Sequence, residues 1–411
     1  MSADPTQTQT RPAELLSGVR VLDLTNVLSG PYATYQMALL GAEVIKVERP
    51  GEGDLARRLG ASPELNARMM GTSFLAQNAG KKSVTIDLKH EDGKALFREL
   101  VASADVLVEN FRPGVMDRLG LGHADLRQVR PDLIYCAISG FGQQGPMRAN
   151  PAYDQIVQGL SGVMSITGDA QSAPLRVGYP LCDTLGGLSA AFAVASALFH
   201  RTRTGEGAFI DLAMLDATIS AMGWAVSNYL IAGVEAQPIG NQNMTAAPSG
   251  AFRCADGPIN IAANKQEQFE RLCDLIGRPD LARDPRFAER ETRKRNRAAL
   301  NALIEEALAA RGAEEWETLL NRNDIPAGRI LTVPQILAHP QIVERALIQD
   351  IAMDQAGLGS VKVVRAGFSL GDSQPTAHGA PPTLGEHNAA IFDDLGIAPE
   401  RLARLKDEGV V

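Results

Sequence analysis

The chain has 411 residues, of which 45% are hydrophobic and 21% are charged, so a globular protein with two domains is expected. A formal net charge of −8 argues against nucleic acid as the main partner, because nucleic-acid binding favours a basic face. The four cysteines have no CxxC spacing and no HExxH pattern occurs, so we expect neither a disulfide framework nor a bound metal.

The N-terminal segment is polar, and residues 1–13 are expected to form a disordered tail without a secretory signal. No run approaches 18 apolar residues, so no membrane-spanning segment is expected. A cytoplasmic enzyme is the default expectation.

Short apolar runs alternate with amphipathic segments along the first half of the chain. Strands are predicted at 19–24, 43–48, 83–88, 106–108, 133–138 and 208–212, and helices at 32–40, 91–102, 124–129 and 186–200. This alternation predicts an α/β fold with an open, Rossmann-like and mostly parallel sheet, whose ligands bind at the carboxyl ends of the strands.

The sequence pattern changes near residue 235, which indicates a second, smaller α+β domain. A loop rich in Asn, Pro and Gly at 241–250 precedes a hairpin around Asp256-Gly257 and helices near 266–277 and 292–311. Strand signals return at 361–364.

Several common site motifs are absent. The sequence has no GxxxxGK[ST] phosphate loop, no GxGxxG after the first strand and no GxSxG nucleophile elbow. Two features remain at predicted strand ends. The loop at 25–31 is either an ordinary turn or a backbone approach to a ligand. The second feature is a set of basic residues: Arg49, Arg112 and Arg118, each after a predicted strand, together with Lys81, Lys82 and Lys89. Each alone would be a solvated surface charge, whereas the three arginines at the strand ends would suit phosphates if they converge.

Asp183 lies between an apolar stretch and the long helix predicted at 186–200. Aspartate is a common helix N-cap, which gives a purely structural interpretation. Its small neighbours Gly186 and Gly187 also leave open space for a substrate carbonyl. Local chemistry does not decide between the two.

The order and spacing of several blocks resemble those of one enzyme family. The blocks are Val21–Thr25 with Ser29–Pro31, Gly41–Pro50 with Gly53-Asp54, Val108–Gly114, Ala152–Asp154, Asp183 with Gly186, Arg203–Gly207 and Leu384–His387. From Leu16 to about Leu405, the chain resembles the class III CoA transferases, the family of formyl-CoA transferase and carnitine CoA transferase.

The resemblance implies an acyl-CoA:carboxylate CoA transferase in which Asp183 is the catalytic nucleophile and forms covalent intermediates. It implies no permanently bound cofactor, since the CoA thioester is a substrate, and its partners are an acyl-CoA donor and a carboxylate acceptor. Arg49 and Arg118 match best by residue type. The implied CoA contacts are Leu28, Ser29, Arg49, Ile86, Asp87, Leu88, Lys89, Asn110, Phe111, Arg112, Arg118, Tyr153 and Asp154.

Two departures bear on the substrate. Leu28 stands where formyl-CoA transferase has glutamine, and the segment 240–250 replaces the glycine-rich loop of that enzyme. A formyl/oxalyl pair is therefore disfavoured, and a larger dicarboxylate such as succinate is expected. Arg176 or the loop that begins at Asn241 would then contact its distal carboxylate.

Two alternative functions stay open. An α-methylacyl-CoA racemase shares this CoA-binding fold but uses a His–Asp pair, and its histidine falls at Tyr153. Tyrosine is a poor base at neutral pH because its ordinary pKa is about 10. The other alternative is a non-catalytic CoA-binding protein, in which Asp183 is only a helix cap.

Relatives of this family form interlocked homodimers, which the resemblance also implies here. It gives a large CoA-binding domain at 14–225 plus 345–411, a small domain at 240–330, and linkers at 226–239 and 331–344.

Overall fold

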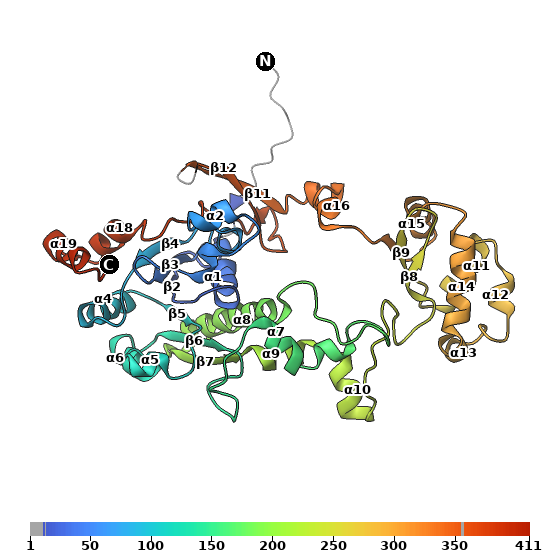
Figure 1. Cartoon of the computed structure of the whole chain (residues 1–411), viewed down its shortest axis with the longest axis horizontal. Helices are drawn as coiled ribbons and strands as arrows, with labels where there is room; N and C mark the ends of the chain where they lie inside the picture. Colours follow the sequence, from blue (N-terminus) through green and yellow to red (C-terminus); the bar gives the residue numbers. More distant parts are fainter. Residues whose placement is uncertain (1–10, 13, 355–356) are drawn as a thin grey trace, which may run out of the picture. The chain divides into compact units, whose positions relative to one another are not determined.

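The computed structural model describes residues 11–12, 14–354 and 357–411 (Figure 1). The chain divides into two compact units. The first contains the residues up to Val163, Val177–Val234 and Val343–Val411, and the second contains Met164–Arg176 and Glu235–Ile342. The short segment Met164–Arg176 therefore groups with residues far along the chain.

A six-stranded sheet forms the centre of the first unit, and every neighbouring pair in it is parallel. In spatial order its strands are β4 (Lys82–Thr85), β3 (Glu43–Glu48), β2 (Arg20–Asp23), β5 (Val106–Glu109), β6 (Ile134–Ser139) and β7 (Ala208–Ala213). This confirms the predicted open parallel sheet. Strand order reverses between β2 and β5, so the loops after these two strands diverge and leave a crevice for a ligand.

Both faces of this sheet are covered by helices, which explains why its strands read as continuous apolar runs. Val21 and Val44 point toward α1 (Ser29–Leu39), α7 (Asp154–Leu160) and α8 (Leu181–Thr204). Leu22 and Ile45 point the other way. On that second face lie α4 (Glu91–Ala102), α6 (His123–Val129), α18 (Asn388–Asp394) and α19 (Pro399–Asp407).

The C-terminal segment returns to the edge of the sheet. The backbone N–H of His387 donates to the Ser83 carbonyl at 2.9 Å, and Gly385 N–H donates to Ser83 Oγ at 3.0 Å. The block Leu384–His387 thereby fixes α18 beside β4.

Shorter elements complete the first unit. They are β1 (Arg11–Pro12) paired with β13 (Ser373–Gln374), β11 (Ile348–Met353) paired with β12 (Gly359–Val364), α2 (Pro63–Ala67), α3 (Thr72–Leu75), α5 (Val115–Arg118), α9 (Met214–Ala221), α10 (Trp224–Ala232) and the 3₁₀ turn η1 (Leu55–Arg58). The elements η2 (Val163–Ile166) and α17 (Pro340–Glu344) lie where the two units meet along the chain.

The second unit has a core of its own, which includes Phe252, Phe269, Phe287 and Trp316. The helix predicted at 292–311 is divided at Asn296, whose side-chain amide donates to the carbonyls of Arg286 and Thr292 and so competes with helical bonding. The unit contains the antiparallel strands β8 (Ser249–Arg253), β9 (Pro258–Ala262) and β10 (Ala327–Arg329), and the helices α11 (Gln266–Leu275), α12 (Asp280–Arg283), α13 (Arg290–Arg295), α14 (Arg297–Leu308), α15 (Ala313–Arg322) and α16 (Val333–Leu337).

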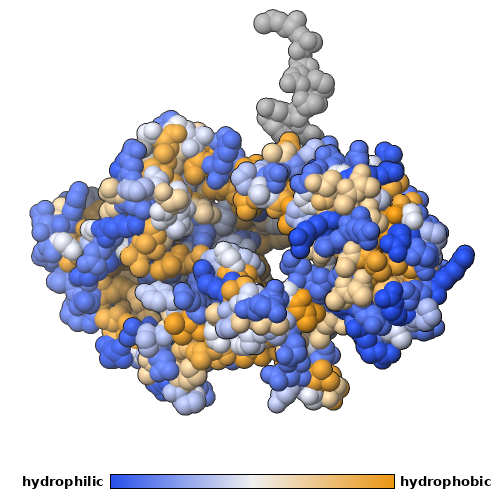
Figure 2. Space-filling model, turned by 45° about the vertical axis from the view of Figure 1, so that its right-hand side comes forward, coloured by the Kyte–Doolittle hydropathy of each residue, from blue (hydrophilic) through white to orange (hydrophobic). Residues whose placement is uncertain are grey.

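Helix α8 is longer than the helix predicted at 186–200, and it is apolar on two sides. Ala190 and Val194 are buried against the sheet, whereas Phe192 is 76% exposed and Phe199 is 65% exposed. Figure 2 shows other apolar side chains at the surface among polar ones. Within the described residues, α8 alone has the length and composition of a membrane span, and a helix packed into a protein core passes the same test.

Candidate active site

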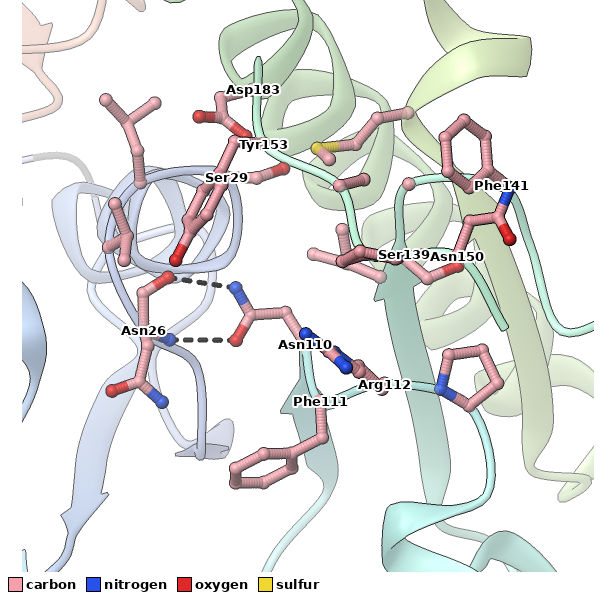
Figure 3. Close-up of a pocket in the computed structure, with 18 of the residues that line it drawn as sticks. Asn26, Ser29, Asn110, Phe111, Arg112, Ser139, Phe141, Asn150, Tyr153 and Asp183 are labelled. Carbon is pink, nitrogen blue, oxygen red and sulfur yellow. Dashed lines mark hydrogen bonds between the residues drawn. The ribbon is translucent and has the colours of Figure 1, made fainter. Parts of the chain in front are cut away.

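A cavity of about 380 Å³ opens at the carboxyl ends of β2, β5 and β6, beside the point where the strand order reverses. Asp183 lies in its wall together with Ser29 and Tyr153, and Figure 3 shows these three side chains gathered at one end of it. The remaining lining residues are Asn26, Val27, Leu28, Leu55, Asn110, Phe111, Arg112, Pro113, Ile138, Ser139, Gly140, Phe141, Arg148, Asn150, Pro151, Ala152 and Met214.

Asp183 is not the N-cap of α8. The helix begins at Leu181 after Pro180, so Asp183 occupies the first turn. Its capping acceptor comes from another helix: Asp154 Oδ1 accepts the backbone N–H groups of Cys182 at 2.8 Å and of Asp183 at 3.4 Å. Among the residues that the structure describes, none donates a hydrogen bond to the Asp183 carboxylate. The interpretation of Asp183 as the N-cap of this helix is therefore wrong.

The surroundings of Asp183 raise the pKa of its carboxyl above the value that it has in water. Burial, and then the nearby charge of Asp154, raise the pKa of Asp183 to about 7. A carboxyl in a cavity wall with a strongly raised pKa, and with no donor among the described residues, is a candidate for a functional group.

Two glycines bring α1 against the same face of α8. A Cβ at Gly187 would lie 2.5 Å from the backbone oxygen of Ser29, and a Cβ at Gly186 would lie 3.0 Å from Ser29 Oγ. Residues three and four positions apart share a face of a helix. The first turn of α1 therefore packs against the face of α8 that carries Asp183.

The loop between β2 and α1 is held from two sides. The side chain of Asn110 accepts the N–H of Asn26 at 2.8 Å and donates to its carbonyl at 2.9 Å, as Figure 3 shows. Val27 has a positive φ of 69°, a strained conformation for a β-branched residue, and its N–H donates to Asp54 Oδ1 at 2.9 Å. These contacts fix the backbone that faces Asp183.

A buried ion-pair network lies beneath this loop. Lys46 Nζ lies 2.9 Å from Asp54 Oδ2, and Lys81 Nζ lies 2.9 Å from Asp23 Oδ2. Burial would raise the pKa of Asp23, but the two ammonium groups outweigh burial and hold that pKa well below its usual range. Lys46 also donates to the Thr25 carbonyl at 2.7 Å, so the network supports the loop.

A second cavity of about 230 Å³ lies beside the first. Asn26 and Phe111 line both, so the two hollows are neighbours. Its other lining residues are Leu24, Thr25, Val47, Glu48, Arg49, Gly53, Ile86, Asp87, Leu88, Lys89, Val115 and Leu119.

A buried carboxyl supports the loop that the two cavities share. Glu109 Oε2 accepts the Phe111 N–H at 2.7 Å, and burial raises the pKa of Glu109 to about 8.

The structure brings most of the sequence-predicted contacts to these two cavities. Leu28, Ser29, Asn110, Arg112 and Tyr153 line the first with Asp183. Those that line the second are Arg49, Ile86, Asp87, Leu88 and Lys89, while Phe111 lines both.

Two predicted contacts lie elsewhere. Asp154 is buried behind the N-terminus of α8, and Arg118 is exposed and lines neither cavity. The basic residues at strand ends also do not converge as one cluster. Lys81 is buried in the ion-pair network, and Lys82 is paired with Glu43.

Sequence reasoning missed Arg148, Asn150 and Ser139 as lining residues. Ser139 ends β6, and the polar segment after this strand carries the other two. The same strand-end argument that selected Arg112 would have selected them.

Residues Arg176 and Asn241, proposed for a distal carboxylate, belong to the second unit. There the loop from Asn241 lines a separate cavity of about 500 Å³ with β9 and the turn at Pro326.

Comparison with known proteins identifies the family of this chain. A sequence model described as CoA-transferase family III matches residues 16–388. The chain is 40% identical over 395 residues to the acetyl-CoA:oxalate CoA-transferase of Acetobacter aceti, covering 96% of this chain and 98% of that protein. It is 36% identical over 383 residues to the succinate–glutarate CoA-transferase of Agrobacterium fabrum, covering 92% and 95%.

A solved structure shows the same fold. The crystal structure of a CAIB/BAIF family protein from Brucella suis superimposes with a TM-score of 0.82 at 36% identity, and the match covers 94% of this chain and all of the other. The fold, the cavity at the strand ends and the family match lead to one conclusion: this chain belongs to CoA-transferase family III and is a CoA transferase.

Proposed function

We propose that this CoA transferase works through covalent intermediates on Asp183 and exchanges CoA between its thioester and a small dicarboxylate. The observation that carries the proposal is the carboxylate of Asp183 in the cavity wall, which no described donor engages and which Asp154 leaves free by capping α8 itself. A carboxylate that donors do not stabilise keeps its nucleophilicity.

The exchange follows from this nucleophile in four steps. An Asp183 carboxylate oxygen attacks the donor thioester carbon, and the C–S bond breaks to give a mixed anhydride and CoA thiolate. The thiolate attacks the aspartyl carbonyl carbon and releases the donor carboxylate, which leaves an aspartyl-CoA thioester. The acceptor carboxylate attacks that thioester to give a new anhydride and thiolate. Attack by the thiolate on the acceptor acyl carbon then regenerates Asp183.

The two neighbouring cavities suit an extended CoA thioester. The second has Arg49 and Lys89 in its wall for phosphate charge and apolar residues for the nucleotide. The first would then hold the pantetheine end and place the sulfur at Asp183. Arg112 and Arg148 line that first cavity and are suited to the distal carboxylate of a dicarboxylate.

The names of some relatives support a short dicarboxylate as the acceptor. Two of them are named for oxalate and for succinate with glutarate. The replacement of glutamine by Leu28 favours the longer acids, so we propose succinate or glutarate over oxalate as the natural acceptor class.

A transfer assay tests this function. The protein is incubated in deuterium oxide with succinyl-CoA and, separately, oxalate, glutarate or acetate, and new CoA thioesters are identified by mass. We expect glutaryl-CoA without deuterium at the α-carbon, and loss of transfer in Asp183→Ala but not in the exposed control Asp407→Ala. Deuterium incorporation without transfer would instead identify a racemase.

We also propose a homodimer. Helix α10 carries Trp224, Leu230 and Ile231 at 71%, 75% and 85% exposure, and α8 exposes Phe192. Large apolar side chains this exposed are typical of a subunit interface. Light scattering coupled to size exclusion should give twice the chain mass, and a monomer at micromolar concentration would exclude this assembly.

A further inference from the structure

The edge of the six-stranded sheet is completed by the segment 385–388. Strand β4 is the last strand on its side of this sheet, so β3 pairs with only one of its two edges. On the other edge His387 donates its backbone N–H to the Ser83 carbonyl at 2.9 Å, and its Nδ1 accepts the Ser83 N–H at 3.2 Å. An open strand edge needs partners for its polar backbone groups, and this segment supplies them.

Asn388 continues this pairing at the last residue of β4. Its Oδ1 accepts the backbone N–H of Thr85 at 2.8 Å, and its Nδ2 donates to Thr85 Oγ1 at 2.8 Å. Gly385 leaves room for this pair, because a Cβ there would lie 3.2 Å from Asn388 Nδ2 and 3.3 Å from Thr85 Oγ1. One side chain therefore holds both the backbone and the side chain of Thr85.

The four residues that follow Thr85 form one wall of the second cavity; they are Ile86, Asp87, Leu88 and Lys89. Backbone contacts hold this wall from two sides. The N–H of Ile86 donates to the Glu48 carbonyl at 2.9 Å, and the N–H of Asp87 donates to the Val410 carbonyl at 2.8 Å. Because Asn388 fixes the residue just before the wall, it determines where the wall starts.

A strand edge could be closed without any effect on a ligand. The place of Asn388 argues for more, because Thr85 ends β4 and the ligand of a parallel sheet binds at the carboxyl ends of its strands. Asn388 itself lines neither of the two cavities, so it acts on a bound molecule only through Thr85 and the wall.

We propose that Asn388 is a positioning residue for the nucleotide end of the CoA thioester. Through Thr85 it holds the wall that carries Lys89, whose ammonium group suits a phosphate. This inference rests on the proposed function, which assigns the second cavity to the nucleotide. Asn388 then affects the KM for CoA thioesters and not the chemistry at Asp183, which lies in the first cavity.

The test compares two donors, succinyl-CoA and succinyl-pantetheine, of which the second lacks the nucleotide and its phosphates; glutarate is the acceptor. Asn388→Ala removes both hydrogen bonds to Thr85, and Thr85→Val removes only the bond to Oγ1. We expect Asn388→Ala to raise the KM for succinyl-CoA about tenfold, because two ordinary hydrogen bonds are lost, and Thr85→Val to raise it about threefold. Both should keep kcat within about twofold, and both should use succinyl-pantetheine like the native protein.

Two further variants make the comparison specific. Asn321→Ala is the matched control, because Asn321 also pairs with a single residue: it donates to the Ala327 carbonyl at 2.9 Å and accepts the Ala327 N–H at 3.2 Å, in the second unit. This control should change the KM for neither donor. Lys89→Ala should raise the KM for succinyl-CoA, and adding Asn388→Ala to it should raise that KM by about threefold or less, because the two residues act through one wall.

The outcomes separate this inference from the function on which it rests. An equal loss with both donors in Asn388→Ala and in Thr85→Val would overturn the inference, because the pair would then only stabilise the fold. A native KM for succinyl-CoA in folded Asn388→Ala would overturn it as well, and either result leaves the function of Asp183 intact. Equal KM values for the two donors in the native protein would overturn the assignment of the second cavity and this inference with it. No transfer from succinyl-CoA by the native protein would overturn the proposed function itself.

Discussion

The carboxylate of Asp154 caps the helix that carries Asp183. Asp154 Oδ1 accepts the N–H of Cys182 and that of Asp183 itself, at 2.8 and 3.4 Å, and so caps α8. Asp183 lines the cavity, and no residue that the structure describes donates a hydrogen bond to its carboxylate, whose pKa is raised by burial and by the nearby charge of Asp154.

This pair predicts a pH dependence. The attacking group is the carboxylate, so kcat/KM should rise with pH along a limb whose apparent pKa is near 7, the value to which burial and Asp154 raise Asp183. Asp154→Asn keeps an acceptor oxygen but removes the charge, so the limb should move to lower pH. Initial rates from pH 5 to pH 9 measure it; an unmoved limb would mean that burial alone sets this pKa.

Ionisation of Asp183 should also lower the free energy of unfolding. Its pKa is raised from 3.8 to about 7, so the native state gains from the protonated form, fully below pH 4, and loses that gain as pH rises through 7. Asp183→Asn mimics the protonated carboxyl and should be more stable than the native protein at pH 8 by about 4 kcal/mol, which corresponds to a rise of the pKa by about three. Urea unfolding at pH 4 and pH 8 measures both; an equal difference at both values would refute the linkage.

The close contact between α1 and α8 predicts that Gly187 is intolerant of a side chain. A Cβ there would lie 2.5 Å from the Ser29 backbone oxygen and 3.0 Å from Tyr32 Cδ1. Gly187→Ala should therefore destabilise the protein by about 1–3 kcal/mol and reduce transfer, because Ser29 must shift. Ser196→Ala, at an exposed position on the same helix, is the control and should change stability by less than about 0.5 kcal/mol.

Substitution of Arg49 tests whether the second cavity binds the nucleotide end of CoA. It lines the second cavity, and at 52% exposure its pair with Glu52 contributes little to stability. Arg49→Ala should raise KM for acyl-CoA about tenfold and leave kcat within about twofold, because phosphate contacts act on the ground and transition states alike. Arg253→Ala, 88% exposed in the second unit, should change neither value. A fall in kcat alone would place Arg49 at the reacting centre.

The sheet was predictable because parallel strands covered on both faces read as continuous apolar runs, as Val106–Val108 and Ile134–Ile138 illustrate. The ligand-binding edge followed from the strand ends. The capping of Asp183 was not predictable, since it depends on Asp154, 29 residues earlier and on a different helix. Lys81 likewise appeared to be a solvated charge because nothing local reveals its buried partner Asp23.

The unpaired Ser29 hydroxyl is a property of packing alone. Sequence identifies the serine and its loop, but its burial against Gly186 of α8 without a described hydrogen-bond partner appears only in the fold.

The central claim is that the acyl group and CoA pass through Asp183. Native protein incubated with succinyl-CoA, quenched with hydroxylamine or borohydride and digested, should yield a modified peptide at Asp183, and Asp183→Asn should yield none. Modification of another residue, or full transfer by Asp183→Asn with no adduct in the native protein, would contradict the account.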